Sequence, residues 1–210
     1  MTSHLLKRLA QSALLIQFAF APHAQADTGQ TAVRKPEWAQ AVDTSANLYL
    51  VDRNFYRSAA LRPQDIKTLN QLGIKTVVNL RSFHSDDGLL KNTGIKAVHV
   101  GINTWEINDQ NVIDALRAIR AGAKEGPVLL HCWHGADRTG LVTAMYRVVF
   151  QDWSKQKALE ELTDGGYGYH SLWKNIPKYM DAVDIEKIRA GVESASFAPA
   201  SRQSHPLQSQ

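Results

Sequence analysis

Residues 127–153 read PVLLHCWHGADRTGLVTAMYRVVFQDW, and this stretch determines the fold that the sequence predicts. The apolar run Pro127 to Cys132 follows the turn signal Glu125-Gly126 and predicts a buried strand. Residues 139–153 are apolar at nearly every position, which predicts a buried helix. The segment HCWHGADRTG, residues 131–140, therefore joins a strand to a helix through a tight loop. Such a loop turns backbone N–H groups toward an anion, with the positive end of the helix dipole behind them.

The loop also carries a nucleophile and a cation that suit a phosphate. A helix N-terminus and a neighbouring cation favour thiolate over thiol, so we expect Cys132 to be largely ionised at neutral pH. Arg138 follows after five intervening residues and offers a planar pair of donors to two phosphate oxygens. We expect the Thr139 hydroxyl to donate to the Cys132 sulfur, and Gly135 to let the backbone bend close to the ligand.

These residues resemble the C-x5-R-[ST] signature of the cysteine-dependent protein tyrosine phosphatases. The order of elements over most of residues 48–178 resembles dual-specificity phosphatases, most closely the periplasmic ones of Gram-negative bacteria. The resemblance implies hydrolysis of phosphotyrosine, with phosphoserine and phosphothreonine left open, through a cysteinyl-phosphate intermediate and without metal or cofactor. It also implies that His131 supports the loop and that the phosphate is bound by Trp133, His134, Gly135, Ala136, Asp137 and Arg138.

The remaining segments alternate between strand and helix patterns. We expect a hairpin of residues 48–51 and 55–58, in which Arg57 forms a partly buried ion pair. Further strands are expected at 75–81 and 95–100, and helices at 63–72, 108–120, 154–166 and 170–190. This alternation predicts an α/β fold with a central, largely parallel sheet flanked by helices. Cys132 then lies at the carboxyl edge of a central strand, where open α/β sheets bind ligands.

The leaving oxygen needs a proton, and the resemblance implies a carboxylic acid on the loop after the strand that ends near Val100. This loop, residues 101–111, contains Glu106 and Asp109. We favour Glu106, because the adjacent Trp105 would desolvate its carboxyl group and favour the protonated form. Asp109 stands where the next helix begins, so a structural role as N-cap or first-turn residue is a strong alternative. Asp86 and Asp87, on another polar loop, are minor candidates.

The N-terminus has the features of an export signal. Lys7 and Arg8 precede an apolar stretch, residues 9–21, and Ala24-Gln25-Ala26 is an A-x-A cleavage site. We therefore expect residues 1–26 to be a signal peptide and the mature protein to be periplasmic or secreted, with no stable membrane insertion. The expected domains are then an arm at 27–46 with one ordered contact at Trp38, a phosphatase domain at 47–193, and a disordered tail at 194–210.

Charge and composition limit the partners. The formal net charge of +4 falls to about +2 when Lys7 and Arg8 are removed, and no basic stripe remains for nucleic acid. We expect a monomer that acts on a phosphorylated protein or a small phosphate ester. A zinc site made of His131, Cys132 and His134 would crowd three ligands into four residues, a spacing that matches no common site.

Several alternatives stay open at this point. A similar HC-x2-G-x2-RTG loop occurs in atypical phosphatases that act on inositol pyrophosphates, although an acidic Asp137 at the pocket rim would favour a singly phosphorylated substrate. A non-catalytic phosphate-binding module would need no nucleophile, and a rhodanese-like sulfur transferase would not explain the Thr-Gly pair after Arg138. The loop at residues 165–169 either lines the pocket or is a turn packed by its tyrosines.

Overall fold

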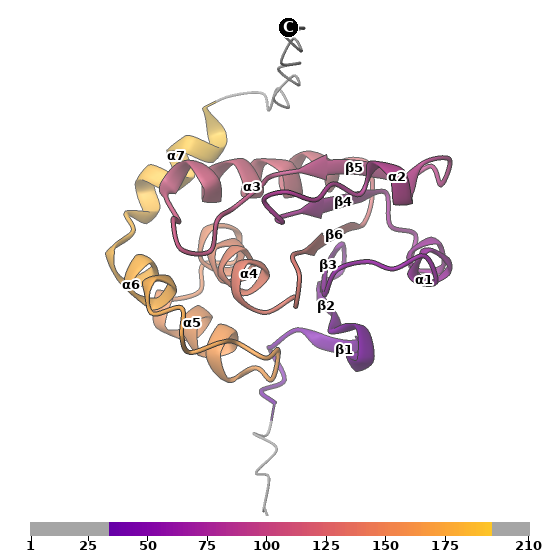
Figure 1. Ribbon diagram of the computed structural model, residues 1–210. Coiled ribbons are helices and arrows are strands. Elements are labelled where there is room, and N and C mark those ends of the chain that lie inside the picture. The colour runs from indigo at the N-terminus through magenta and orange to yellow at the C-terminus, as the bar shows by residue number, and fades with distance from the viewer. Residues whose placement is uncertain (1–33, 195–210) are drawn as a thin grey trace, which may run out of the picture. The chain divides into compact units, whose positions relative to one another are not determined.

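Six strands form one sheet in the structure, a computed structural model that describes residues 34–194 (Figure 1). The strand order is β1-β2-β3-β6-β4-β5. β1, β2 and β3 pair antiparallel, whereas β3, β6, β4 and β5 pair in parallel, which confirms the predicted, largely parallel sheet. The strands are β1 (Gln40–Asp43), β2 (Leu48–Asp52), β3 (Phe55–Ser58), β4 (Thr76–Asn79), β5 (Lys96–His99) and β6 (Val128–His131).

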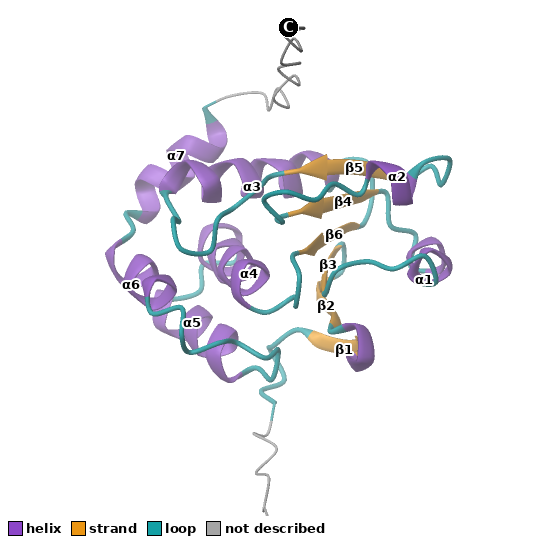
Figure 2. Ribbon diagram, in the orientation of Figure 1, coloured by secondary structure: helices purple, strands orange, loops and turns teal. Residues whose placement is uncertain are grey.

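Helices cover both faces of the sheet (Figure 2). On one face, α3 to α7 pack in a large core with Val78 and Leu130, and on the other, α1 and α2 pack in a smaller core with Val77 and Leu129. The predicted α/β class is therefore confirmed. The helices are the 3-10 turn η1 (Thr44–Ala46), α1 (Asp65–Gln71), α2 (Asp87–Leu90), α3 (Asp109–Gly122), α4 (Asp137–Phe150), α5 (Lys155–Asp164), α6 (Asn175–Ala182) and α7 (Ile185–Glu193).

β6 lies in the middle of the sheet between β3 and β4, and all four of its residues are buried. Its alternate side chains enter the two cores, with Leu130 on one face and Leu129 on the other. An apolar side chain is thus needed at every position, which explains why the sequence shows a continuous apolar run and no alternation. β4 is buried in the same way. The carboxyl end of β6 therefore lies midway along the side of the sheet at which the parallel strands end.

The described part of the expected arm joins the sheet instead of standing apart from it. β1 pairs with β2, Trp38 and Ala39 are 3% and 1% exposed, and the Ala39 amide donates to the Glu161 carboxylate at 2.7 Å. Sequence patterning could not predict β1, because all four of its side chains are exposed and the strand is held by its backbone. The predicted signal peptide, residues 27–33 and tail residues 195–210 lie outside the described residues.

Two other boundaries differ from the prediction. α4 begins at Asp137 and ends at Phe150, before Asp152, whose φ of 53° is incompatible with a helix. The polar loop after β4 contains the short helix α2, which starts at Asp87. Among residues 34–194, no helix combines the length and the apolar character needed to span a bilayer.

Candidate active site

The loop between β6 and α4 is held from outside through its carbonyl oxygens. The three donors are Ala60 N, 2.9 Å from the Trp133 oxygen, Asn47 Nδ2, 2.7 Å from the His134 oxygen, and Arg57 Nη2, 2.6 Å from the Gly135 oxygen. In a trans peptide the N–H points away from the C=O, so the amides of residues 134–136 face the opposite, inner side of the loop. Three consecutive amides therefore form a concave donor surface, as an anion requires.

Gly135 is required by the close approach of this loop to β3. Its φ is +70°, and a Cβ atom at this position would lie 2.5 Å from the Ser58 carbonyl oxygen. Both the left-handed backbone and the contact exclude a larger residue. Cys132 lies just after the end of β6 and is 2% exposed, so its sulfur sits at the base of the loop.

Arg138, the second residue of α4, extends its guanidinium along the carboxyl edge of the sheet. Its Nη1 donates to the carbonyl oxygens of Leu80, after β4, at 3.3 Å and of Ile102, after β5, at 3.2 Å. Its Nε has no hydrogen-bond partner among the described residues. The guanidinium thus keeps donor capacity for a ligand while two backbone oxygens hold it in place. The Thr139 hydroxyl is buried and also lacks a partner there, so the predicted bond to Cys132 is not formed.

His131 connects the loop to a buried charged pair. Its Nε2 lies 2.6 Å from Asp86 Oδ2 and its Nδ1 lies 3.1 Å from the Cys132 carbonyl oxygen. Asp86 also accepts a hydrogen bond from Arg81 Nη2 at 2.6 Å, and all three side chains are buried. Asp86 therefore orients the His131 ring beside the loop, and the supporting role of His131 stays a prediction.

Asp86 is not placed to act as the general acid. Burial by itself would raise the pKa of Asp86, but the hydrogen bond and charge of His131, together with Arg81, outweigh burial and hold it below the usual value. A carboxyl group that stays ionised has no proton to give. These contacts do not favour Asp86 as the acid. They connect the loop that follows β4 to His131.

Asp109, at the start of α3, contacts side chains of α6 and α7. Its carboxylate lies 2.7 Å from Lys187 Nζ in α7 and accepts a hydrogen bond from the Tyr179 hydroxyl in α6 at 3.1 Å. The hydrogen bond from Lys187 is the main reason that the pKa of Asp109 lies below its usual value. Asn108 is the N-cap of α3, so Asp109 is a first-turn residue. The contacts of Asp109 thus support its structural role as a first-turn residue of α3.

Glu106 lies at the tip of the loop between β5 and α3. Ser82 Oγ contacts Asn103 Oδ1 at 2.7 Å, and Asn175 Nδ2 donates to the Thr104 oxygen at 2.7 Å, so the base of this tip is anchored. Glu106 itself is exposed and Trp105 is 64% exposed. The expected desolvation of the Glu106 carboxyl group by Trp105 is therefore wrong for this structure, because neither side chain is buried.

Arg57 and Tyr167 support the loop of residues 132–138 from its outer side, a role that the sequence did not indicate. Arg57 is 1% exposed, and its guanidinium carbon lies 3.6 Å from the centroid of the Tyr167 ring. It forms no ion pair with a described residue, so the ion pair expected for it is wrong. Asn47 donates both to His134 and to the Tyr167 carbonyl oxygen, at 2.7 and 2.9 Å. The segment at 165–169 is thus a turn packed by Tyr167.

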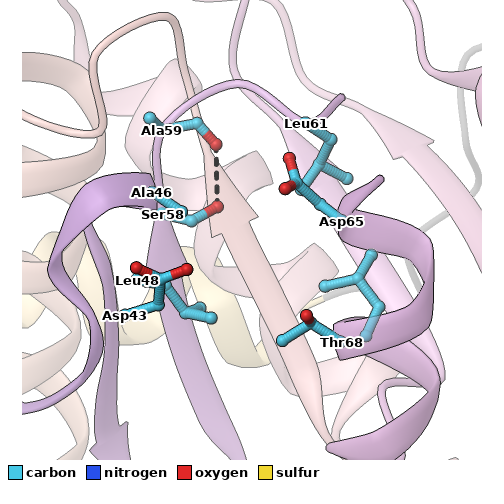
Figure 3. Close-up of a pocket in the computed structure, with 9 residues that line it drawn as sticks. Asp43, Ala46, Leu48, Ser58, Ala59, Leu61, Asp65 and Thr68 are labelled. Atoms are coloured by element: carbon cyan, nitrogen blue, oxygen red, sulfur yellow. Dashed lines mark hydrogen bonds between the residues drawn. The ribbon is translucent and has the colours of Figure 1, made fainter. Parts of the chain in front are cut away.

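A small cavity lies between α1 and the ends of β2 and β3 (Figure 3). Its volume of about 20 Å³ leaves room for a single water molecule. Asp43 and Asp65 line it together with apolar side chains, and the Ser58 hydroxyl donates to the Ala59 carbonyl oxygen at 2.8 Å. Two carboxylates and so little space do not suit a phosphate ester.

Comparisons with known proteins show the family to which this chain is similar. A model of the tyrosine phosphatase family matches residues 44–171. The dual specificity protein phosphatase TpbA of Pseudomonas aeruginosa (strain UCBPP-PA14) is 40% identical over 171 residues, which cover 80% of this chain and 77% of TpbA. The inositol diphosphatase DSP3 of Arabidopsis thaliana is 28% identical over 153 residues, which cover 69% of this chain and 73% of that protein. A crystal structure of a P. aeruginosa TpbA variant in complex with phosphotyrosine superposes with a TM-score of 0.71 at 38% identity, covering 77% of this chain and 99% of that chain.

Proposed function

Because the chain belongs to the tyrosine phosphatase family, we propose that it hydrolyses phosphotyrosine monoesters with Cys132 as the nucleophile. The loop of residues 132–138 carries this proposal, since a recessed cysteine, a concave row of amides and Arg138 converge there. A thiolate beside fixed donors for the phosphate oxygens is the arrangement that covalent phosphoryl transfer needs. The complex of the P. aeruginosa relative with phosphotyrosine supports this choice of substrate.

The reaction consists of two displacements at phosphorus. In the first, the Cys132 sulfur bonds to phosphorus, the bond to the tyrosine oxygen breaks, and a carboxylic acid gives that oxygen its proton. In the second, a water molecule attacks phosphorus, the P–S bond breaks, and the water proton returns to the carboxylate. Arg138 and the loop amides bind the equatorial oxygens during both steps.

Glu106 is the residue that we propose as the acid. It lies on the loop that follows β5, at the same edge of the sheet as Cys132, and its side chain is exposed. Asp86 and Asp109, the other candidates with resolved contacts, are both engaged with cations in the described structure. These contacts favour Glu106 over Asp86 and Asp109 for the role.

The depth of the site favours an aryl phosphate. Cys132 is 2% exposed, whereas the neighbouring Trp133 is 45% exposed and Trp105 is 64% exposed. The phenyl ring of phosphotyrosine is long enough to carry its phosphate past such a rim and presents a face for aromatic contacts. Phosphoserine and phosphothreonine are shorter, so we expect them to be hydrolysed more slowly.

Inositol diphosphates are a second candidate class, because a relative at 28% identity is named for that activity. The structure also weakens our argument against them. The Asp137 side chain is 9% exposed and contacts His170, so it does not present its charge openly at the pocket rim. Phosphotyrosine remains the first choice because the relatives at 38–40% identity are named protein phosphatases.

We further propose that the enzyme acts after export, as a monomer in the periplasm or outside the cell. The support is the basic, apolar and A-x-A pattern of residues 1–26 together with the single cysteine, since no second thiol is present to form a disulfide with Cys132. Blockage of N-terminal processing by Ala24→Leu, with loss of protein from the periplasmic fraction, would support the proposal. An unprocessed chain in the cytoplasm for the native sequence would contradict it.

The enzymatic proposal is tested with a substrate panel. Purified protein and its Cys132→Ser variant are compared on matched phosphotyrosine and phosphoserine peptides and on an inositol diphosphate, with release of inorganic phosphate as the readout. We expect hydrolysis of the phosphotyrosine peptide by the native protein and none by the variant. Equal rates for the two proteins would refute the assignment of the nucleophile, and a preference for the inositol diphosphate would favour the second class.

A further inference from the structure

Three side chains with metal-binding atoms converge beside the phosphate loop. His134 and Asp137 come from the loop and the first turn of α4, and His170 comes from the segment between α5 and α6. One ligand atom from each of the three side chains lies within 4.8 Å of the other two. The two imidazole rings are 5.2 Å apart between centroids. This cluster could not be found from spacing, because His170 is far from the other two residues in sequence.

The carboxylate in this cluster is already fixed in position. Asp137 Oδ1 accepts a hydrogen bond from the His170 backbone N–H at 2.9 Å, and its Oδ2 lies 2.9 Å from His170 Nδ1. His134 is the only member that has to move, and it is exposed. A preorganised pair with one adjustable ligand lowers the cost of assembling a site.

Asp137 also lacks a permanent positive partner. It is 6% exposed, and within residues 34–194 its one ion pair is with His170, a group that is charged only when protonated. The neighbouring Arg138 instead directs its guanidinium to the carbonyl oxygens of Leu80 and Ile102. A buried carboxylate is costly unless a cation or several donors compensate it. A bound cation would supply that compensation.

The distances fit a small tetrahedral ion. With metal–ligand bonds of about 2.0–2.1 Å, tetrahedral geometry separates neighbouring ligand atoms by about 3.3 Å. The 2.9 Å between Asp137 Oδ2 and His170 Nδ1 is close to this value, and the 4.8 Å limit for the whole set exceeds it by roughly 1.5 Å. Two imidazoles and a carboxylate are ligands that suit zinc and similar divalent transition metals.

We propose that His134, Asp137 and His170 form a binding site for a divalent transition metal of the zinc class, with one coordination position open to water. The metal replaces the proton between His170 and Asp137, while the backbone N–H of His170 keeps its bond to Oδ1 and orients the carboxylate. Occupation ties the phosphate loop to the segment before α6. It also adds positive charge beside the anion cradle without contributing a ligand to the reacting phosphate.

The test uses the full-length Cys132→Ser protein, because a cysteine thiolate itself binds zinc. Zinc chloride is titrated calorimetrically, and cobalt(II) chloride is titrated while the visible absorption of tetrahedral cobalt is followed. The variants are His134→Gln and His170→Gln, singly and together. His84→Gln is the matched control, since His84 is also exposed and lies against Trp133 but is not part of the cluster.

We expect one zinc ion per chain, a loss of affinity of at least about tenfold in each single variant, and no change in the control. Zinc should also raise the unfolding temperature of the Cys132→Ser protein and not that of the double variant. The proposal is overturned if the Cys132→Ser protein binds no zinc, or if the double variant binds it equally well. Neither result depends on turnover, so both leave the proposed phosphatase function untouched.

Discussion

Replacement of Asp86 by asparagine should destabilise the protein and slow its reaction, because Asp86 contacts the buried side chains of Arg81 and His131 next to the loop of residues 132–138. It lies 2.6 Å from both His131 Nε2 and Arg81 Nη2. Asparagine preserves the shape of the side chain but removes its charge. His131 then loses the partner that orients its ring against the Cys132 carbonyl oxygen.

The expected magnitude follows from the two charged hydrogen bonds. Each is worth roughly 1.5–3 kcal/mol. The single amide oxygen of asparagine can keep only one of the two bonds, in a weaker form, so we expect a net loss of about 3 kcal/mol. For a protein of this size about 2–4 °C of unfolding temperature corresponds to each kcal/mol, which gives a fall of roughly 6–12 °C. Thermal unfolding followed by circular dichroism at pH 6 measures it, and kcat on an aryl phosphate should fall in parallel.

The pH dependence gives a second readout with a defined sign. The pKa of Asp86 is lowered in the folded protein, so its ionised form stabilises the fold above the unfolded pKa of about 3.9, and this contribution is lost as the pH falls through the folded value. The difference in unfolding free energy between native protein and variant should therefore be full at pH 6 and shrink below about pH 4. Asp164→Asn, a change at an exposed carboxylate at the end of α5, is the control and should stay within about 0.5 kcal/mol. Equal stability of Asp86→Asn and native protein, or a difference that does not change with pH, would refute this account.

Three further changes probe the site. Glu106→Gln should lower kcat by roughly 10²-fold on substrates with poor leaving groups and less on activated ones, whereas Asp109→Asn should chiefly lower stability. If steady-state kinetics show the leaving-group effect for Asp109→Asn instead, Glu106 is not the acid. Gly135→Ala places a Cβ atom 2.5 Å from the Ser58 oxygen at a φ of +70°, so phosphate release should fall to the level of Cys132→Ser, and near-native turnover would contradict the assigned loop geometry. Arg57→Met removes the hydrogen bond to the Gly135 carbonyl oxygen, so inhibition by inorganic phosphate should weaken about tenfold, the equivalent of one net hydrogen bond. An unchanged inhibition constant would mean that the loop keeps its shape without Arg57.

The sequence by itself determined the strand, loop and helix that form the centre of the fold. Residues 127–153 contain strand, loop and helix in succession, so chain connectivity places Cys132 and Arg138 at the two ends of one short loop. The unbroken apolar run of β6 indicated burial on both faces, and the alternation of strands and helices indicated a parallel sheet. In each case the information lies within one short segment, where chain connectivity leaves few alternatives.

The tertiary structure decided which distant groups serve that centre. Glu106, Asp109 and Asp86 are similar carboxyl groups in sequence, and only packing shows that Asp109 binds Lys187 and that Asp86 binds His131. β1 left no pattern, because backbone pairing holds it while its side chains are exposed. His170 reaches Asp137 only through the fold. Contacts between residues that are far apart in the chain depend on how the helices pack on the sheet, and no periodicity or spacing within a segment records that packing.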